Sequence, residues 1–233
     1  MRLDKFLVEM NQGTRSRVRE LIRRGLVTVN GVPAGNADTR IDEGTDIVCV
    51  QGRALSYQRF FYYMLNKPRG FVSSTQERMS ETVMELLRPE DRRPDLFPAG
   101  RLDKDTEGFL LLTNDGELAH RLLSPKKHVD KTYRVNIEHG LCPEDIQRLE
   151  QGVDIGEDRL TLPAKVKQLE ERVILLTLHE GKFHQVKRML KAVDNGVTAL
   201  KRVSFGGLTL DESLGAGEYR RLTEDEVKIL YGA

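Results

Sequence analysis

The feature that most constrains the fold is an uncharged run, Phe-Leu-Leu-Leu at positions 109–112, which follows a charged turn. Consecutive apolar residues bounded by turn residues are typical of a strand that is buried on both faces of a sheet. The turn contains Gly100, Arg101, Asp103 and Asp105. A charged loop joined to a buried strand is held by the scaffold and remains open to a ligand. This turn is therefore a candidate site, although a solvated salt bridge accounts for the same residue types.

Length and composition exclude several classes of protein. A chain of 233 residues is long enough for one substantial core and a small module. Its 37 Lys and Arg residues balance 36 Asp and Glu residues, so any nucleic-acid surface must be local. Cys49 and Cys142 lack metal-ligand spacing, and we expect two buried, reduced thiols in a cytoplasmic protein. No uncharged stretch approaches about 20 residues, so we expect no membrane span and no export signal.

The first 25 residues predict two helices. Leu3, Phe6, Leu7 and Met10 share one helical face. A second helix begins near Thr14 or Ser16 and ends at Gly25. Its arginines outnumber its single acid, Glu20, and planar guanidinium groups in a row suit phosphate oxygens. These arginines occupy one flank at Arg15, Arg19 and Arg23 and the other flank at Arg17 and Arg24.

An Asn-Gly turn follows this helix. Residues 27–32 alternate around Asn30-Gly31, which predicts a hairpin with a type I′ turn. Ile41, Ile47, Cys49 and Val50 suggest further short strands. Together these elements resemble the RNA-binding module named after ribosomal protein S-four, although an ordinary helical packing domain is the alternative. We assign the module to residues 1–55, a linker to 56–60 and a second domain to 61–233.

The second domain contains both predicted strands and predicted helices. Neither a phosphate-binding glycine loop nor a metal-spaced set of His and Cys is present. The expected strands are at 61–65, 71–75, 109–112, 133–137 and 173–178, and the expected helices are at 82–87, 118–123, 143–151, 186–193 and from 223 onward.

The sequence from Gly100-Arg101-Leu102-Asp103 through Thr113-Asn114-Asp115-Gly116 closely resembles the central motif of pseudouridine synthases. Lys131-Thr132-Tyr133 and the stretch from Gly181 to Leu190 are similar to the second and third motifs of that family. The match is best with the RsuA branch, which modifies ribosomal RNA. The resemblance implies an α+β fold class, in which a mixed, mainly antiparallel sheet has flanking helices. It also implies that Asp103 is catalytic, that Tyr133 stacks on the target base and that Lys187 pairs with Asp103.

The resemblance implies isomerisation of a uridine in 16S ribosomal RNA by base flipping, without a cofactor or metal. We expect a monomer that acts on RNA in a protein-bound assembly intermediate. Arg101 either fills the vacated stack or holds a phosphate. Action on 23S ribosomal RNA, a non-catalytic RNA-binding role and a glycosidase using Asp103 with Asp105 are the alternatives. The expected substrate-binding residues are Arg101, Arg15, Arg17, Arg19, Arg23, Lys67, Lys131, His184 and Arg188.

Overall fold

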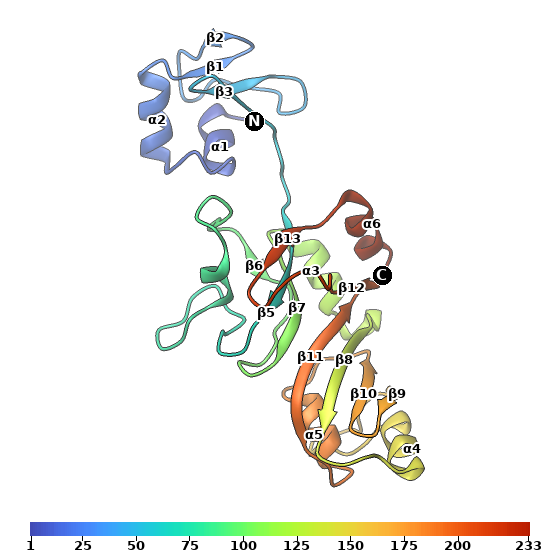
Figure 1. The fold of residues 1–233 in the computed structure, drawn as a ribbon. Helices are drawn as coiled ribbons and strands as arrows, with labels where there is room; N and C mark the ends of the chain where they lie inside the picture. Colours follow the sequence, from blue (N-terminus) through green and yellow to red (C-terminus); the bar gives the residue numbers. More distant parts are fainter. The chain divides into compact units, whose positions relative to one another are not determined.

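The computed structural model describes residues 1–233, which divide into two compact units, residues 1–60 and residues 61–233 (Figure 1). In the first unit, two helices and a four-stranded sheet of order β2-β1-β3-β4 share one apolar core. The elements are α1 (Leu3–Glu9), α2 (Arg15–Arg23), β1 (Val27–Val29), β2 (Val32–Pro33), β3 (Val48–Val50) and β4 (Arg53–Leu55).

Local signals in the first unit act as the sequence predicts, with one exception. The Thr14 hydroxyl accepts a hydrogen bond from the Arg17 amide and so caps α2. Asn30 and Gly31 have φ angles of 51° and 81°, which a type I′ turn requires. The expectation of a strand at Ile41 is wrong, because this buried side chain enters the core from an irregular segment next to the isolated bridge between Arg2 and Arg40.

The second unit is built on a nine-stranded sheet of order β13-β5-β7-β11-β8-β10-β9, with β6 and β12 attached at its side. Only the β7–β11 pair is parallel, so the expected mixed, mainly antiparallel sheet is confirmed. The strands are β5 (Tyr62–Lys67), β6 (Phe97–Pro98), β7 (Glu107–Thr113), β8 (Lys131–Ile137), β9 (Lys165–Glu170), β10 (Val173–Leu178), β11 (Val197–Phe205), β12 (Leu208–Thr209) and β13 (Tyr219–Arg221).

Helices cover two separate parts of this sheet (Figure 1). Apolar side chains of α4 and α5 pack with β8, β10 and β11 in one core, and those of α3 and α6 pack with β5, β7 and β11 in the other. The α-helices are α3 (Gly116–Leu123), α4 (Pro143–Gln151), α5 (Gln185–Lys191) and α6 (Glu224–Gly232), and the 3₁₀ turns are η1 (Val83–Leu86) and η2 (Pro125–Lys127).

Strand β7 contains the uncharged run and is central to the second unit. It pairs with β5 on one side and β11 on the other, and residues 108–113 are all buried. The predicted two-sided burial is therefore confirmed. Gly108 permits this pairing, because a Cβ atom there would lie 2.2 Å from the carbonyl oxygen of Arg202, and its φ is +101°.

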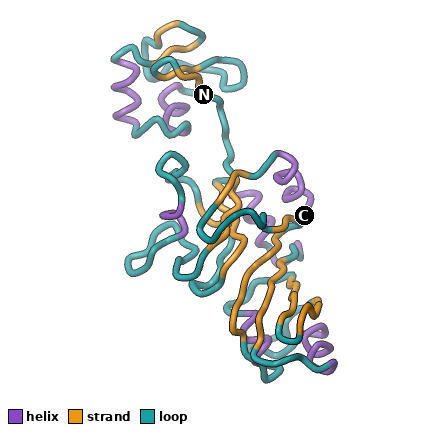
Figure 2. Tube along the Cα trace, in the orientation of Figure 1, coloured by secondary structure: helices purple, strands orange, loops and turns teal.

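Two other expectations are wrong. Residues 71–75 form no strand, since Val72 makes only an isolated bridge to Thr82, and Figure 2 shows mostly loop between β5 and β7. Cys142 is exposed rather than buried because it lies at the N-cap of α4, where its thiol contacts Asp145. None of the helices has the length and apolar character needed to cross a lipid bilayer.

Candidate active site

A buried lysine fixes the loop that carries Asp103. The Lys67 side chain, at the end of β5, has no exposed surface. Its Nζ donates to the carbonyl oxygens of Thr106 at 2.8 Å, Pro68 at 3.0 Å and Asp103 at 3.1 Å, and lies 3.4 Å from that of Lys104. Burial lowers the pKa of Lys67 to about 8, although nearby carboxylates oppose this shift. The expected contact of Lys67 with substrate is wrong, because the lysine is a brace within the loop.

Three further hydrogen bonds hold the same loop. Ser73 Oγ donates to the carbonyl oxygen of Leu102 at 2.9 Å and accepts from the Leu102 amide at 3.0 Å. The Gly70 amide donates to the carbonyl oxygen of Lys104 at 2.8 Å. Residues 67–73 therefore fasten the loop from one side, while β7 fastens its end. The backbone around Asp103 is positioned before any ligand arrives.

Two side chains of the segment 184–187 face the acids of this loop. Lys187 Nζ lies 2.7 Å from Asp105 Oδ1 and 3.5 Å from Asp103 Oδ2. His184 Nε2 lies 3.7 Å from Asp103 Oδ1. The lysine thus pairs with Asp103, as the motif predicts, but its shorter contact is with Asp105. The hydrogen bond from Lys187 lowers the pKa of Asp105 below its usual value.

Tyr133 lies in the same cavity as these groups. It is the third residue of β8, it is half-buried, and it packs against the core under α4 and α5. With Asp103 and Lys187 it lines a small cavity of ≈ 80 Å³, which Arg101 and Leu200 also border. Asp103, Arg101 and His184 further line an adjoining groove of ≈ 750 Å³. A carboxylate, a cation and an aromatic ring therefore converge from three separate elements.

A buried arginine behind the cavity has no signal in the sequence. Arg202 of β11 lies opposite Tyr133 in one neighbouring strand and opposite Gly108 in the other. Its Nε donates to the carbonyl oxygen of Phe109 at 2.8 Å, and its Nη2 has no hydrogen-bond partner. Burial lowers the pKa of Arg202, and the Tyr133 hydroxyl opposes that shift. Only the strand register reveals this proximity, because an arginine in a strand normally suggests an exposed position.

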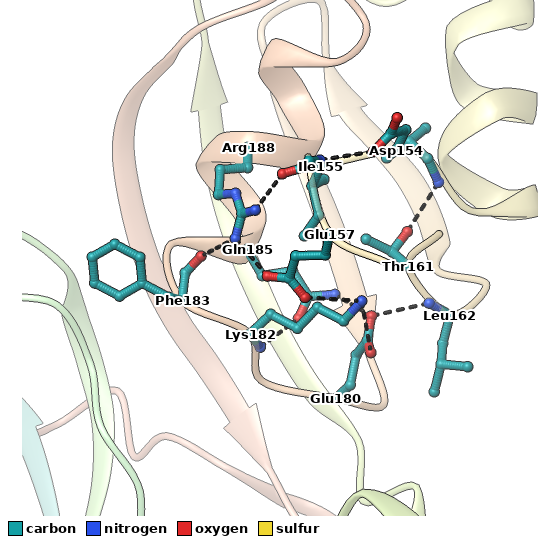
Figure 3. Close-up of polar contacts among 12 residues, drawn as sticks. Asp154, Ile155, Glu157, Thr161, Leu162, Glu180, Lys182, Phe183, Gln185 and Arg188 are labelled. Atoms are coloured by element: carbon teal, nitrogen blue, oxygen red, sulfur yellow. Dashed lines mark hydrogen bonds and ion pairs between the residues drawn. The ribbon is translucent and has the colours of Figure 1, made fainter. Parts of the chain in front are cut away.

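The structure places two other expected substrate-binding residues outside the cavity. Lys131 is buried, and its Nζ donates to the carbonyl oxygen of Val129 at 3.0 Å. Arg188 donates through Nη1 to Glu157 at 2.7 Å and through Nη2 to the carbonyl oxygen of Ile155 (Figure 3). Backbone and carboxylate oxygens of the chain engage both side chains in this structure, so their contact with RNA stays a prediction.

The expected RNA contacts of the first unit are exposed. All the arginines of α2 and its C-cap have accessible side chains. Arg17 and Arg24 pair with Glu20 at 3.0 and 3.4 Å, and Arg19 lies 3.6 Å from Asp4.

Nowhere in the chain are three His, Cys, Asp or Glu side chains arranged as a metal site.

Comparison with known proteins identifies the family. A family model described as RNA pseudouridylate synthase matches residues 61–192, and an S4 domain model matches residues 1–47. An uncharacterized RNA pseudouridine synthase of Bacillus subtilis is 50% identical over 99% of this chain and 98% of its own. Ribosomal small subunit pseudouridine synthase A of Vibrio cholerae is 43% identical over 99% of this chain and 100% of its own.

A solved structure agrees with these matches. The crystal structure of a pseudouridylate synthase that is 38% identical superposes with a TM-score of 0.71 and covers 99% of both chains. The similarity extends through both units, including the loop that carries Asp103. The chain belongs to the RNA pseudouridine synthase family, with an S4 domain at its N-terminus.

Proposed function

We propose that this chain isomerises one uridine of small-subunit (16S) ribosomal RNA to pseudouridine, with Asp103 as the catalytic carboxylate. The observation that carries the proposal is the cavity that Asp103 shares with Tyr133 and Lys187. The choice of small-subunit RNA is supported by the name of the Vibrio cholerae relative, which is 43% identical over nearly the whole chain.

The reaction exchanges one glycosidic bond for another. The bond from ribose C1′ to N1 breaks, the uracil ring turns, and a bond from C1′ to C5 forms. The proton on C5 leaves to solvent and N1 gains a proton, so the product has the same atoms as the substrate. Asp103 can attack C1′, attack the uracil ring or accept a ribose proton, and each route needs its ionised form. The cation of Lys187, 3.5 Å away, stabilises that form.

Tyr133 has a separate role in this proposal. A uridine in folded RNA must leave its stack before its C5 is reachable, at a cost of a few kcal/mol. Contact between a base and an aromatic ring recovers about 1 to 3 kcal/mol. Tyr133 is held in β8 beside the carboxylate, so its ring is positioned to receive the extruded base.

RNA docking belongs to the first unit in this proposal. The exposed arginines of α2 present forked donors to phosphates, and we assign residues 1–55 to docking. A single copy supplies Asp103, Tyr133 and Lys187, so a monomer suffices for the chemistry. We assign the isomerisation to the cytoplasm, where a protein-bound assembly intermediate presents the target uridine.

Release of tritium from C5-labelled RNA tests the proposal. The purified chain is incubated with labelled 16S RNA, labelled 23S RNA and protein-bound 16S assembly intermediates from cells that lack the gene. We expect release from the 16S substrates and a single new pseudouridine when that RNA is mapped. Release from 23S RNA alone would move the target to the large subunit, and release from neither RNA would refute the proposed activity.

A further inference from the structure

An exposed aromatic pair lies beside the proposed catalytic carboxylate. The Phe183 side chain is 72% exposed, although a large apolar ring is normally buried. Its ring stacks on that of His184, with centroids 3.8 Å apart and planes 21° from parallel. His184 in turn lies 3.7 Å from Asp103. The pair therefore leads from the carboxylate toward solvent.

The backbone that carries this pair is firmly held. Arg188 Nη1 donates to the carbonyl oxygen of Phe183 at 3.1 Å and also binds Glu157. The buried Gln185 side chain accepts from the Lys182 amide at 2.9 Å and donates to Glu180 at 2.6 Å. Figure 3 shows the Phe183 ring pointing away from this polar network. The network thus holds the backbone that carries the ring, which reduces the entropy lost when a ligand binds.

The surroundings suit a base attached to a phosphate backbone. The groove of ≈ 750 Å³ lined by Phe183 and His184 also reaches Asp103. Its volume falls within the roughly 300 to 1,000 Å³ typical of ligand sites. Three cationic side chains border the groove at Arg101, Lys104 and Lys182, and the carboxylates are those of Asp103 and Glu77. Of these cations, Lys182 also pairs with Glu157 at 3.4 Å.

We propose that the Phe183–His184 pair is a stacking surface for a nucleobase of the substrate RNA that neighbours the flipped uridine. This inference rests on the proposed function in taking RNA as the ligand. Tyr133 would then receive the target base, while Phe183 receives an adjacent base that loses its stacking partner when the uridine leaves. In this arrangement Tyr133 and Phe183 each replace part of the base stacking that the RNA loses.

Fluorescence of 2-aminopurine tests the inference without turnover. The full chain is titrated into a short oligouridylate that contains one 2-aminopurine, a base whose emission falls when it stacks. We expect Phe183→Leu to weaken binding about 5- to 150-fold and to abolish the quenching. Phe183→Tyr keeps the ring and should behave as the wild type. Leu169→Ala, which alters an apolar residue of β9 that is 44% exposed, is the matched control and should change nothing.

The three variants separate the aromatic ring of Phe183 from its apolar bulk and from its contribution to folding. Because Phe183 is largely exposed, Phe183→Leu should leave the melting temperature unchanged. Wild-type affinity and quenching in Phe183→Leu would overturn the inference, as would an equal loss in Phe183→Tyr. A chain that quenches through Phe183 but releases no tritium from ribosomal RNA would refute the proposed function alone. Tritium release without ring-dependent quenching would refute the stacking surface alone.

Discussion

The arginine helix of the first unit and the Asp103 loop of the second hold their charges in opposite ways. The arginines of α2 and its C-cap are exposed; Arg17 and Arg24 pair with Glu20 at the surface, and only Arg19 lies near a buried carboxylate, that of Asp4. The Asp103 loop is tied by a fully buried lysine, by Ser73 and by a strand buried on both faces. Exposed charges can follow an irregular phosphate backbone, whereas a reaction needs a carboxylate at a fixed place. The arginine helix is therefore suited to RNA docking, and the Asp103 loop is suited to catalysis.

The largest expected effect follows from Asp103→Asn. The amide keeps the size of the side chain but has no negative charge, so turnover should fall at least about 10³-fold. RNA affinity should persist, because docking rests on other residues. Tritium release and equilibrium binding are measured on the same preparation. Asp105→Asn, which removes the nearer partner of Lys187, is the matched control and should retain more activity.

Lys67→Met tests whether the loop depends on its buried brace. The change removes the donor of the Pro68 and Thr106 carbonyl oxygens, whereas those of Asp103 and Lys104 keep the amides of Thr106 and Gly70 as donors. The free energy of unfolding should therefore fall by about 1 to 3 kcal/mol. Denaturant titration measures this, and Lys126→Met, at an exposed lysine, should have little effect. An unchanged stability in Lys67→Met would show that the loop is held by its other contacts.

The lowered pKa of Lys67 also predicts a pH dependence of stability. The folded state releases this proton near pH 8, whereas the unfolded state keeps it until about 10.5. Between these values the unfolded state binds more protons, so this lysine makes stability rise with pH. Lys67→Met should remove its share of the rise, at most about 1.4 kcal/mol per pH unit. Identical pH slopes for both proteins would contradict the assignment.

Replacing Arg15, Arg19 and Arg23 together by Gln tests the docking side of the comparison. Each lost phosphate contact should lower the slope of log K against log salt concentration by about 0.7 to 0.9, or roughly 2 to 3 in all. The single-turnover rate of fully bound RNA should stay near that of the wild type. If the triple variant keeps the full salt slope of the wild type, these arginines are only a solvated surface and do not contact phosphates.

Lys187→Ala should have a smaller effect, on pH dependence. Without the lysine, the pKa of Asp105 should rise toward its usual value of 3.8, as a carboxyl NMR titration would show. A lowered carboxyl pKa contributes stability that is lost as pH falls through it, so the wild type should lose this contribution in acid and the variant should lack it. An unchanged Asp105 titration in the variant would contradict the pairing of Lys187 with this carboxylate.

The sequence predicted the elements whose signals are local. The two-sided burial of β7, the cap at Thr14 and the Asn30-Gly31 turn each depend on neighbouring residues, and each is confirmed. The charged residues were harder to place. A lysine in a turn looks solvated, and only the folded chain shows that Lys67 faces backbone carbonyls. Arg202 was missed because its place behind Tyr133 depends on the register between β8 and β11.

The difference between local signals and distant contacts also accounts for the error at residues 71–75. Their composition permits a strand, but their backbone groups find loop partners such as Glu81 instead of a neighbouring strand. Arg188 shows that a distant contact can also occupy a side chain that the sequence predicts to be open. The motif places it on a basic helical face, yet Glu157 and the carbonyl oxygen of Ile155, more than twenty-five residues earlier, engage it. Contacts between distant segments decide which charges remain open to a ligand.

The structure of the Asp103→Asn variant bound to an RNA that carries the mapped uridine tests the central claim most directly. The account predicts that the target uracil lies out of its stack on the Tyr133 ring, with its ribose beside residue 103, while phosphates contact the arginines of α2. A target uridine that remains stacked in the RNA, or that lies against the arginine helix instead of the Asp103 loop, would contradict this division between docking and chemistry.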